Sequence, residues 1–550
     1  MPTITLNRKV FDELVGKRLN DEKIKENLAM LGTDLEKLKE KEIIIEVFPD
    51  RPDMLSEQGF ARAFSSFIGK KTGLQRFKVI KTKDQVIAEK SLPKQWPYAF
   101  ACIVKGLKFN DEKIRELVQI QEKLGVTLLR ERKKGGIGLY PLEKIKFPVR
   151  FIGMNPDEIK FRPLEYPHEI SGREILSKHP TGRKYAHICE HWDKFPVFVD
   201  AKNTMMSMPP IINSHYVGKI DETTTDVFVE VTGNDIKTTK IALIIIVTAL
   251  SDMGGTIYSL ENVMQNGEKI QFPDLTPKKM NLDLKYVNKI LGLELNEKEV
   301  KTLLQRMGFN YSDKTVLIPA YRSDILHEID LVEDIAIAYG YDNFKEQIPK
   351  VATIADENAF HKFKEKIANL LIGFGLLETN SYVLTNPLNL NKKMHLNLKY
   401  VEIENPNSSE YTCLRTWMIP SLLEILSNNK HHEFPQKIFE LGYCFKENKS
   451  KTRVEELTRL GVLTSHKEVS FTEVKQILDN LMKLLDLKYE IKDADHPSFI
   501  DGRVGRISVN DKDVAYIGEI NPKVLYNWEL EMPVSGFELN LTELYKFIEK

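Results

Sequence analysis

Length is the first constraint on how this chain can fold. The sequence has 550 residues, whereas a single hydrophobic core stops growing at roughly 250–300 residues. At about 150 residues for each domain, we expect roughly three to five domains. The apolar fraction of 42% and the charged fraction of 29% are ordinary for globular proteins, so each domain has enough apolar surface to bury a core.

The overall charge narrows the class of protein. The chain has 79 Lys plus Arg and 79 Asp plus Glu, so its net charge is zero. A protein that binds nucleic acid non-specifically is basic overall, and this balance argues against that class. One local basic cluster consists of Arg130, Arg132, Lys133 and Lys134. It either contacts phosphates or is a solvated loop, and the sequence leaves both open.

Cysteine usage and hydropathy indicate the compartment. Cys102, Cys189, Cys413 and Cys444 are widely scattered and not at metal-ligand spacing, which predicts reduced, mostly buried thiols in a reducing cytoplasm. The N-terminus has neither the basic nor the apolar region of a secretory signal. The longest apolar stretch, residues 241–250, is about half the length that spans a bilayer. We therefore expect a soluble cytoplasmic protein without a membrane segment.

The first half of the chain mixes helices and strands. Near the N-terminus we expect a charged helix over residues 28–41, a β-branched strand over 42–48 and a helix over 55–68. Further on, we expect an amphipathic helix over 111–124 and a strand over 227–232. On that strand Glu230 and Thr232 alternate with valines, so both side chains face one side.

An acidic segment near the middle of the chain invites a metal. It closes a helix–helix–strand–helix unit, residues 282–343, whose size resembles a winged-helix module. Asp330, Glu333 and Asp334 lie on one face of the predicted acidic helix, and Asp324 is expected at its start. A hard cation such as Mg²⁺ would relieve their mutual repulsion. The alternative is an N-cap and a solvated helix face, favoured by the macrodipole.

The last two hundred residues are typical of a large antiparallel sheet with flanking helices. A helix is expected over residues 359–374, and strands over 378–384, 437–443 and 537–541. Two further strands, 507–509 and 514–517, flank Asn-Asp-Lys-Asp, which predicts a hairpin.

Several blocks, in this order along the chain, resemble the β subunit of phenylalanyl-tRNA synthetase of the archaeal and eukaryotic type. The blocks are residues 46–63, Met208-Pro-Pro-Ile-Ile-Asn-Ser214, Val229-Glu-Val-Thr-Gly233, residues 318–343, Asn405-Pro406, Leu414-Arg415 and Phe439-Glu-Leu-Gly442. The resemblance covers essentially the whole chain, and the order and spacing of the blocks make it specific.

The resemblance implies a multidomain α+β architecture. Its expected parts are an N-terminal α/β domain at 1–90, an α/β editing domain (B3/B4) at 91–266, a winged-helix-like metal-binding module (B5) at 270–346, and a class II synthetase-like antiparallel sheet with helices at 350–550. It also implies an (αβ)₂ heterotetramer whose α subunit aminoacylates tRNA(Phe) with ATP and phenylalanine. Near Leu414-Arg415 no set of arginines suits a nucleoside triphosphate, so ATP is expected to be used by the complex.

Two sites follow from the resemblance. The first is Mg²⁺ on Asp324, Asp330, Glu333 and Asp334, at a contact with the α subunit. The second is an editing site for tRNA(Phe) charged with tyrosine, because an apolar pocket rejects one extra hydroxyl only weakly. Ser214, Glu230 and Thr232 are its expected residues. Glu230 stands where the archaeal pattern often has Asp, and the segment after Leu124 lacks the family's common histidine.

Other readings remain open. A zinc site on His187, Cys189 and His191 lacks a fourth ligand nearby. The chain as a whole could instead be a nucleic-acid-binding assembly module that edits nothing, or a stand-alone metal-dependent hydrolase built on the four carboxylates. Co-purification with a class II synthetase partner would separate the ligase subunit from both.

Overall fold

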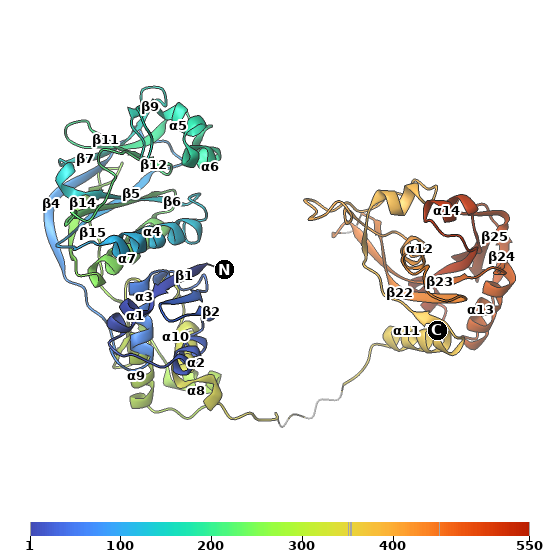
Figure 1. The fold of residues 1–550 in the computed structure, drawn as a ribbon. Helices are drawn as coiled ribbons and strands as arrows, with labels where there is room; N and C mark the ends of the chain where they lie inside the picture. The colour runs from blue at the N-terminus through green and yellow to red at the C-terminus, as the bar shows by residue number, and fades with distance from the viewer. Residues whose placement is uncertain (1, 350, 352–354, 450, 549–550) are drawn as a thin grey trace. The chain divides into compact units, whose positions relative to one another are not determined.

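The structure, a computed structural model, describes residues 2–349, 351, 355–449 and 451–548. It divides the chain into two compact units, Met1–Ile348 and Pro349–Lys550 (Figure 1). Both contain helices and sheets, which confirms the expected mixed α and β, multidomain architecture at this level.

The N-terminal part of the first unit is a small antiparallel sheet, in the order β1-β3-β2, with helices packed on it. Its elements are β1 (Thr3–Asn7), α1 (Arg8–Val15), α2 (Asp21–Met30), β2 (Asp34–Leu38), β3 (Glu42–Glu46), η1 (Pro52–Met54) and α3 (Glu57–Phe67). The helix predicted over residues 28–41 is wrong. Helix α2 ends at Met30, and Gly32 has a left-handed conformation with φ +85°. The charged segment that follows forms β2 and pairs with β3, so sheet pairing overrides its helical propensity.

A ten-stranded sheet dominates the rest of this unit, in the order β12-β11-β10-β7-β4-β14-β5-β13-β6, with β15 beside β14. Its strands are β4 (Val79–Ala88), β5 (Tyr98–Lys105), β6 (Gly135–Pro141), β7 (Val149–Met154), β10 (Phe195–Val199), β11 (Met205–Met208), β12 (Ile212–Asn213), β13 (Val227–Gly233), β14 (Thr256–Val263) and β15 (Lys269–Phe272). Since β4 pairs with β7 and β14, the expected domain boundary at residue 90 falls after the first strand of this sheet.

The two faces of the large sheet are covered differently (Figure 1). Helices α4 (Asp111–Val126) and α7 (Ile236–Asp252) cover one face, where Val229 and Val231 of β13 join their core. The other face packs on a second core that includes Tyr140, Met206 and Met208. Around it lie η2 (Leu142–Lys144), β8 (Lys160–Phe161), β9 (Ile170–Ser171), α5 (Gly172–Lys178) and α6 (Pro180–Cys189).

The acidic segment belongs to a small module at the end of the first unit. The module contains β16 (Lys278–Asn281), α8 (Leu284–Leu291), α9 (Glu297–Arg306), β17 (Asn310–Ser312), β18 (Thr315–Ile318), α10 (Glu328–Tyr339) and η3 (Tyr341–Asn343). The helices and the strand expected here are present, and β16 and β17 complete a three-stranded sheet. The prediction that Asp324 lies at the start of the acidic helix is wrong. Asp324 lies in the loop before α10, which begins at Glu328. His327 is the N-cap, because Asp330 accepts the backbone N–H groups of Leu326 and His327.

The second unit is built on a seven-stranded sheet, in the order β19-β22-β23-β27-β26-β25-β24. Its strands are β19 (Leu377–Glu378), β22 (Gln436–Glu447), β23 (Val454–Ser465), β24 (Glu490–Asp493), β25 (Phe499–Val509), β26 (Lys512–Ile520) and β27 (Val534–Asn540). Each pair is antiparallel except β19 with β22. The expected hairpin is confirmed, with Asn510 and Asp511 at φ +48° and +63° between β25 and β26.

Helices flank this sheet, as expected. They are α11 (Ala359–Gly373), η4 (Leu388–Lys392), α12 (Ile419–Asn428), α13 (Phe471–Leu484), α14 (Pro522–Asn527) and α15 (Leu541–Tyr545), and a short pair is formed by β20 (Leu384–Thr385) and β21 (Cys413–Leu414).

The four cysteines are buried free thiols, which confirms the expectation of reduced, buried cysteines. Burial raises the pKa of each of these thiols above its ordinary value. In the part of the chain that the structure describes, no helix is both long and apolar enough to span a membrane.

Candidate functional site

Small residues clear one face of the large sheet around Glu230 and Thr232. Glu230 on β13 lies opposite Ala101 of β5 and Gly138 of β6. Thr232 lies opposite Ala99 and Gly136 in the same two strands. Directly opposed residues of antiparallel strands share a face. A Cβ added at Gly138 would collide with Glu230 Oε1 and the Tyr140 hydroxyl, so glycine is what leaves room for this carboxyl group.

Glu230 has no cationic partner in a hydrogen bond or ion pair among the described residues. Its side chain is buried, with 1% of the residue exposed. The Tyr140 hydroxyl donates to Glu230 Oε1 at 3.0 Å, while Oε2 has no hydrogen-bond partner within the described chain. Burial raises the pKa of Glu230 to about 8, against the opposing effect of the Tyr140 hydrogen bond. The group is therefore mostly protonated at pH 7 and can both donate and accept a hydrogen bond.

Three further polar side chains complete what we call the Glu230 cluster, which comprises Tyr140, Ser207, Asn213, Glu230 and Thr232. Asn213 Oδ1 lies 3.3 Å from the Tyr140 hydroxyl and is half-buried, so the cluster reaches the surface there. Burial and Glu230 raise the pKa of Tyr140, and the nearby Ser207 hydroxyl lowers it. In the described residues neither Ser207 Oγ nor Thr232 Oγ1 has a well-oriented hydrogen bond of its own. Unpaired buried polar atoms are costly, which makes this cluster a candidate for a ligand.

Ser214 was expected in the same site, and the structure gives its hydroxyl another partner. Ser214 Oγ accepts the backbone N–H of Tyr216 at 3.3 Å. No hydrogen bond in the described part of the chain joins it to Glu230 or Thr232. Ser207 and Tyr140 were missed by the sequence reasoning. A partial signal existed for Tyr140, because Gly136, Gly138 and Tyr140 alternate on one strand and so share one face. The pairing of β6 with β13 makes it the face of Glu230.

The expected metal ligands are divided by an arginine. Arg322 donates to both oxygens of Asp324, with Nη2–Oδ2 at 2.6 Å, and to Asp334 Oδ2 at 2.6 Å. Its guanidinium is buried, with 2% of the side chain exposed. A cation is therefore already present beside two of the four carboxylates.

Asp330 and Glu333 are the carboxylates that remain outside this pairing. Asp330 uses Oδ2 to cap α10. Burial raises the pKa of Glu333, and so do the negative charges of Asp334, Asp50, Asp330 and Asp324. Among the described residues these four expected ligands include no three whose oxygens all lie within 4.8 Å of one another.

The donor chemistry of this region still fits a magnesium ion. All four groups are oxygen ligands, and Mg²⁺ commonly uses one or two carboxylates together with water. Burial first, and then the neighbouring carboxylates, raise the pKa of Glu333, and a cation would relieve the repulsion among these carboxylates. Glu333 and the second carboxylate oxygen of Asp330 lie outside these contacts, whereas Asp330 Oδ2 caps α10 and Asp324 and Asp334 are paired with Arg322.

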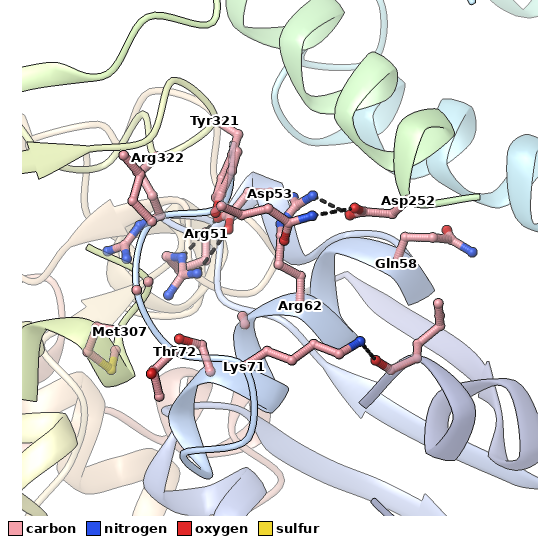
Figure 2. A pocket seen from close by; sticks show the side chains of 17 residues that line it. Arg51, Asp53, Gln58, Arg62, Lys71, Thr72, Asp252, Met307, Tyr321 and Arg322 are labelled. Carbon is pink, nitrogen blue, oxygen red and sulfur yellow. Dashed lines mark hydrogen bonds and ion pairs between the residues drawn. The ribbon is translucent and has the colours of Figure 1, made fainter. Parts of the chain in front are cut away.

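A cavity of about 350 Å³ lies next to this network, where α3, α7 and the module meet (Figure 2). Arg51 pairs with Asp53 at 2.9 Å, and Arg62 pairs with Asp252 at 2.5 Å while stacking on Tyr321. With Arg322 on its two aspartates, each buried arginine here has a carboxylate partner. With Lys71, which also lines the cavity, the four cations are matched by the carboxylates of Asp53, Asp252, Asp324 and Asp334, so the region has no excess positive charge to attract an anion.

The second unit contains a buried ion pair at the expected Leu414-Arg415 block. Arg415 Nη1 donates to Glu440 Oε1 and to Ser381 Oγ, both at 2.8 Å. Arg415 Nε donates to the carbonyl of Tyr443. The arginine is 2% exposed, so its guanidinium binds Ser381, Glu440 and Tyr443 inside the protein and is not presented to a ligand.

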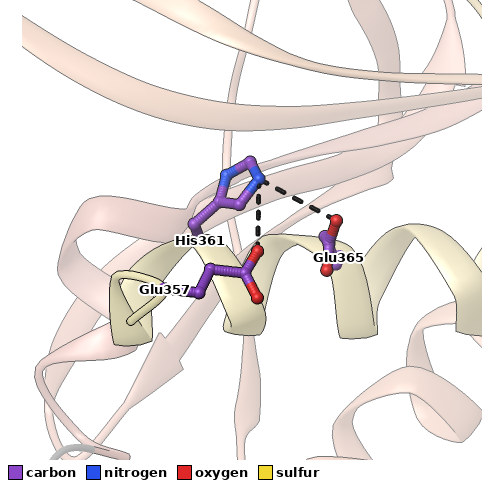
Figure 3. A group of neighbouring side chains, drawn as sticks. All are labelled: Glu357, His361 and Glu365. Carbon is purple, nitrogen blue, oxygen red and sulfur yellow. Dashed lines mark ion pairs between the residues drawn. The ribbon is translucent and has the colours of Figure 1, made fainter. Parts of the chain in front are cut away.

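One further group of possible metal ligands lies at the start of α11 (Figure 3). In the described residues, Glu357, His361 and Glu365 are the one group of three with ligand atoms within 4.8 Å. His361 Nε2 lies 3.6 Å from Glu357 and 3.8 Å from Glu365. All three are exposed, and ordinary i,i+4 pairing on a helix accounts for them. Among the described residues, His187, Cys189 and His191, which were considered as zinc ligands, do not form a group of ligand atoms within this distance.

Curated relatives match 98–99% of the chain, and two family profiles match parts of it. The profile of the phenylalanyl tRNA synthetase beta chain CLM domain matches residues 345–541, and that of the tRNA synthetase B5 domain matches residues 280–341. The chain is 38% identical over 571 aligned positions to the phenylalanine–tRNA ligase beta subunit of Thermococcus onnurineus, covering 99% of both. It is 38% identical to the same subunit of Methanococcus aeolicus, covering 98% of this chain and 100% of the relative.

A solved structure is similar to the first part of the chain. It is the crystal structure of an N-terminal fragment of the phenylalanyl-tRNA synthetase beta subunit from Pyrococcus horikoshii. The TM-score is 0.59 and the sequence identity 34%, and the match covers 62% of this chain and 99% of the fragment.

Proposed function

This chain belongs to the family of phenylalanine–tRNA ligase β subunits, and we propose that it has two tasks within that class II ligase. It assembles with a catalytic α subunit, and it hydrolyses tRNA(Phe) that carries tyrosine. Membership of the family carries the first task, since the relatives match along 99% of the chain. The Glu230 cluster carries the second.

The assembly is an (αβ)₂ heterotetramer in the cytoplasm. Its α subunit uses ATP to attach phenylalanine to tRNA(Phe). Two features support this division of labour. The buried guanidinium of Arg415 is engaged by Glu440, so the second unit does not offer it to a triphosphate. The acidic segment of the first unit has carboxylates with chemistry suited to Mg²⁺ at a subunit contact.

The metal would stabilise the contact with the α subunit. Asp330 and Glu333 would hold Mg²⁺, with Asp324 and Asp334 close by through Arg322. The chemistry that the ion supplies is charge neutralisation across an interface. Arg322 meanwhile keeps the loop before α10 attached to the helix, because it binds Asp324 in that loop and Asp334 in the helix.

The Glu230 cluster suits the recognition of a tyrosyl side chain. Tyrosine differs from phenylalanine by one hydroxyl, and Glu230 Oε2 is a buried hydrogen-bonding atom without a partner in the described residues. A site built to hydrogen-bond a hydroxyl rejects the analogue that lacks it, because the buried group then stays unpaired. Glu230 therefore selects tyrosyl esters, and Tyr140 orients its carboxyl group.

Hydrolysis needs one water beside the ester. The water oxygen bonds to the ester carbonyl carbon, the bond from that carbon to the ribose oxygen breaks, and a proton passes from the water to the ribose oxygen. Thr232 and Ser207 have buried hydroxyls with unused hydrogen-bonding capacity, which suits the orientation of that water. The residues of this chain thus bind the tyrosyl ester, orient the attacking water and exclude the phenylalanyl ester.

Hydrolysis of pre-formed Tyr-tRNA(Phe) by the complete complex tests this proposal. We expect Glu230→Ala to lower the ratio of Tyr-tRNA to Phe-tRNA hydrolysis by roughly 100-fold or more, as sites that lose a buried hydroxyl contact do. Thr232→Ala lowers the rate for Tyr-tRNA. Glu268→Ala, an exposed carboxylate in a turn of the same sheet region, serves as the control. An unchanged ratio in Glu230→Ala would show that the chain assembles without editing through this cluster.

A further inference from the structure

Three consecutive residues before β6 have left-handed backbone conformations. Arg130, Glu131 and Arg132 lie at φ +48°, +52° and +64°. L-residues with side chains rarely adopt this conformation, and runs of it are costly. Strain of this kind persists where the surrounding structure holds it and often marks a functional element. The turn contains no glycine at these positions, so its geometry calls for an explanation.

Backbone hydrogen bonds hold the turn against the end of α4. Glu131 N donates to the carbonyl of Val126 at 3.1 Å, and Arg132 N donates to that of Gly125 at 3.0 Å. Lys134 N returns to the carbonyl of Leu129 at 3.0 Å. These hydrogen bonds fix the conformation of the turn, so the backbone sets the direction in which each side chain leaves it.

Arg132 is directed from this turn onto a different loop. Its Nη1 donates to the carbonyl oxygen of Pro210 at 3.1 Å and to that of Ile211 at 2.8 Å. The guanidinium also stacks on the Tyr185 ring of α6, with Cζ 4.4 Å from the ring centroid. One side chain thus ties together the end of α4, the loop after β11 and helix α6. Pro210 and Ile211 are buried, so their carbonyls depend on a protein donor.

The loop that Arg132 holds forms one wall of the Glu230 cluster. The Cα of Pro210 lies 3.0 Å from the position of a Cβ added at Gly136, and Thr232 Oγ1 lies 3.7 Å from the same point. Ser207 and Asn213 lie on either side of this loop and pair with each other across β11 and β12. A shift of the loop would therefore move two members of the cluster and the space beside a third.

We propose that Arg132 is a positioning residue for the hydrolysis of Tyr-tRNA, and that the left-handed turn exists to aim it at the loop of Pro210 and Ile211. This inference rests on the proposed editing function. Arginine suits the task because its planar guanidinium can donate in plane while stacking on an aromatic face. Lysine keeps the charge and a donor but has no flat face for Tyr185.

Two glycine variants separate the role of the side chain from that of the strained backbone. Glu131→Gly and Arg132→Gly each relieve one left-handed residue, but only Arg132→Gly removes the contacts to the loop. The measurements are single-turnover hydrolysis of Tyr-tRNA(Phe) by the complete complex, the concentration of complex that gives half the maximal rate, and the melting temperature.

We expect Glu131→Gly to melt at or slightly above the wild-type temperature and to hydrolyse Tyr-tRNA within about twofold of wild type. Arg132→Gly should hydrolyse at roughly 1–10% of the wild-type rate, as misplaced active-site groups do, with half-saturation within about twofold. Arg132→Lys should recover part of the lost rate. A rate for Arg132→Gly equal to that of Glu131→Gly would overturn the inference, as would a loss in Arg132→Gly that appears only in half-saturation.

Glu230→Ala distinguishes failure of this inference from failure of the proposed function. If Glu230→Ala abolishes the preference for Tyr-tRNA while Arg132→Gly stays fully active, the editing function stands and the positioning role is wrong. If neither variant changes hydrolysis, the Glu230 cluster is not the editing site and both proposals fall together.

Discussion

Glu230 and Glu440 are buried glutamates of two different sheets, each with 1% of its surface exposed, and they have opposite environments. Glu440 meets a guanidinium and a hydroxyl, from Arg415 and Ser381. Glu230 meets one neutral hydroxyl, from Tyr140. Equal burial therefore leads to an ion pair in one unit and to an uncompensated carboxyl group in the other.

Glycine has a different task beside each glutamate. A Cβ at Gly442 would collide with Arg415 Nη2, so that glycine makes room for the arginine that neutralises Glu440. A Cβ at Gly138 would collide with Glu230 Oε1 and the Tyr140 hydroxyl, so that glycine makes room for the carboxyl group itself and not for a cationic partner. Charge compensation, and not burial, therefore separates a structural carboxylate from one available for binding.

The largest expected effect is on the compensated side. Arg415→Ala should lower the free energy of unfolding by about 3–5 kcal/mol, because Glu440 would remain buried without its partner. Urea unfolding of a chain in which Trp96 and Trp192 of the first unit are replaced by Phe, followed by the fluorescence of Trp417 and Trp528, measures it.

Lys475→Ala is the matched control, since it breaks an exposed pair with Asp479 in the same unit and should cost about 0–1 kcal/mol. Arg415→Met combined with Glu440→Leu should recover much of the loss, because a well-packed apolar pair can replace a buried ion pair. Equal losses for Arg415→Ala and Lys475→Ala would remove the distinction between the two glutamates.

The uncompensated glutamate should make stability depend on pH. The folded-state pKa of Glu230 is raised to about 8 from 4.5, so the folded state binds the proton more tightly. Its contribution to stability is fully present below about pH 4.5 and is lost as the pH rises through about 8. We expect the stability of Glu230→Gln relative to wild type to rise by a few kcal/mol between pH 5 and pH 8.

Urea unfolding of both proteins at the two pH values measures this difference. Glu57 and Glu116 also have raised pKa values, of about 8 and about 7. They titrate in both proteins and cancel in the comparison. A relative stability that stays constant from pH 5 to pH 8 would mean that Glu230 is compensated in solution.

The acidic module lies between the two extremes, because Arg322 neutralises part of its charge. Removal of Mg²⁺ with a chelator should lower the stability of the heterotetramer by about 1–3 kcal/mol, the size expected for loss of a bound ligand. Asp330→Asn combined with Glu333→Gln should abolish the response to Mg²⁺.

Thermal unfolding of the complex with and without Mg²⁺ checks this, together with its metal content. Asp342→Asn removes an exposed carboxylate from the same module and should leave the Mg²⁺ response intact. If the double variant still responds like wild type, the metal is bound elsewhere.

The smallest effect is expected for Tyr140, whose hydroxyl is the hydrogen-bond donor to Glu230. Tyr140→Phe removes one hydrogen bond, worth about 0.5–1.5 kcal/mol, and so should slow hydrolysis of Tyr-tRNA by roughly 2- to 10-fold. Because that bond lowers the pKa of Glu230, its loss should also move the pH-dependent fall in stability to higher pH. Tyr258→Phe on β14 is the control. A larger loss, comparable to Glu230→Ala, would assign Tyr140 a direct contact with the substrate.

The sequence predicted those features that depend on local periodicity. Alternation with valines placed Glu230 and Thr232 on one face of a strand, and helical spacing placed Asp330 and Glu333 on one helix. Features that depend on pairing between distant strands were not predictable. Tyr140 meets Glu230 because β6 pairs with β13, whereas Ser207 comes from β11, which pairs with β10 and β12. The segment 34–38 became a strand because β3 pairs with it.

The acidic helix shows the same limit at shorter range. Four carboxylates in the sequence indicated one centre, but Arg322, two residues before Asp324, divides them. Spacing along a helix does not reveal which cation a carboxylate will meet. The metal and editing assignments of these residues stay predictions that the experiments above decide.

The buried thiols described above make the chain convenient for spectroscopy. Cys102, Cys189, Cys413 and Cys444 are shielded and have raised pKa values, so maleimide dyes should react with them slowly. One cysteine introduced at an exposed site in each unit, such as Lys194→Cys and Lys467→Cys, would then accept a fluorophore selectively. Energy transfer between the two dyes would report how the distance between the units changes as the α subunit and tRNA bind.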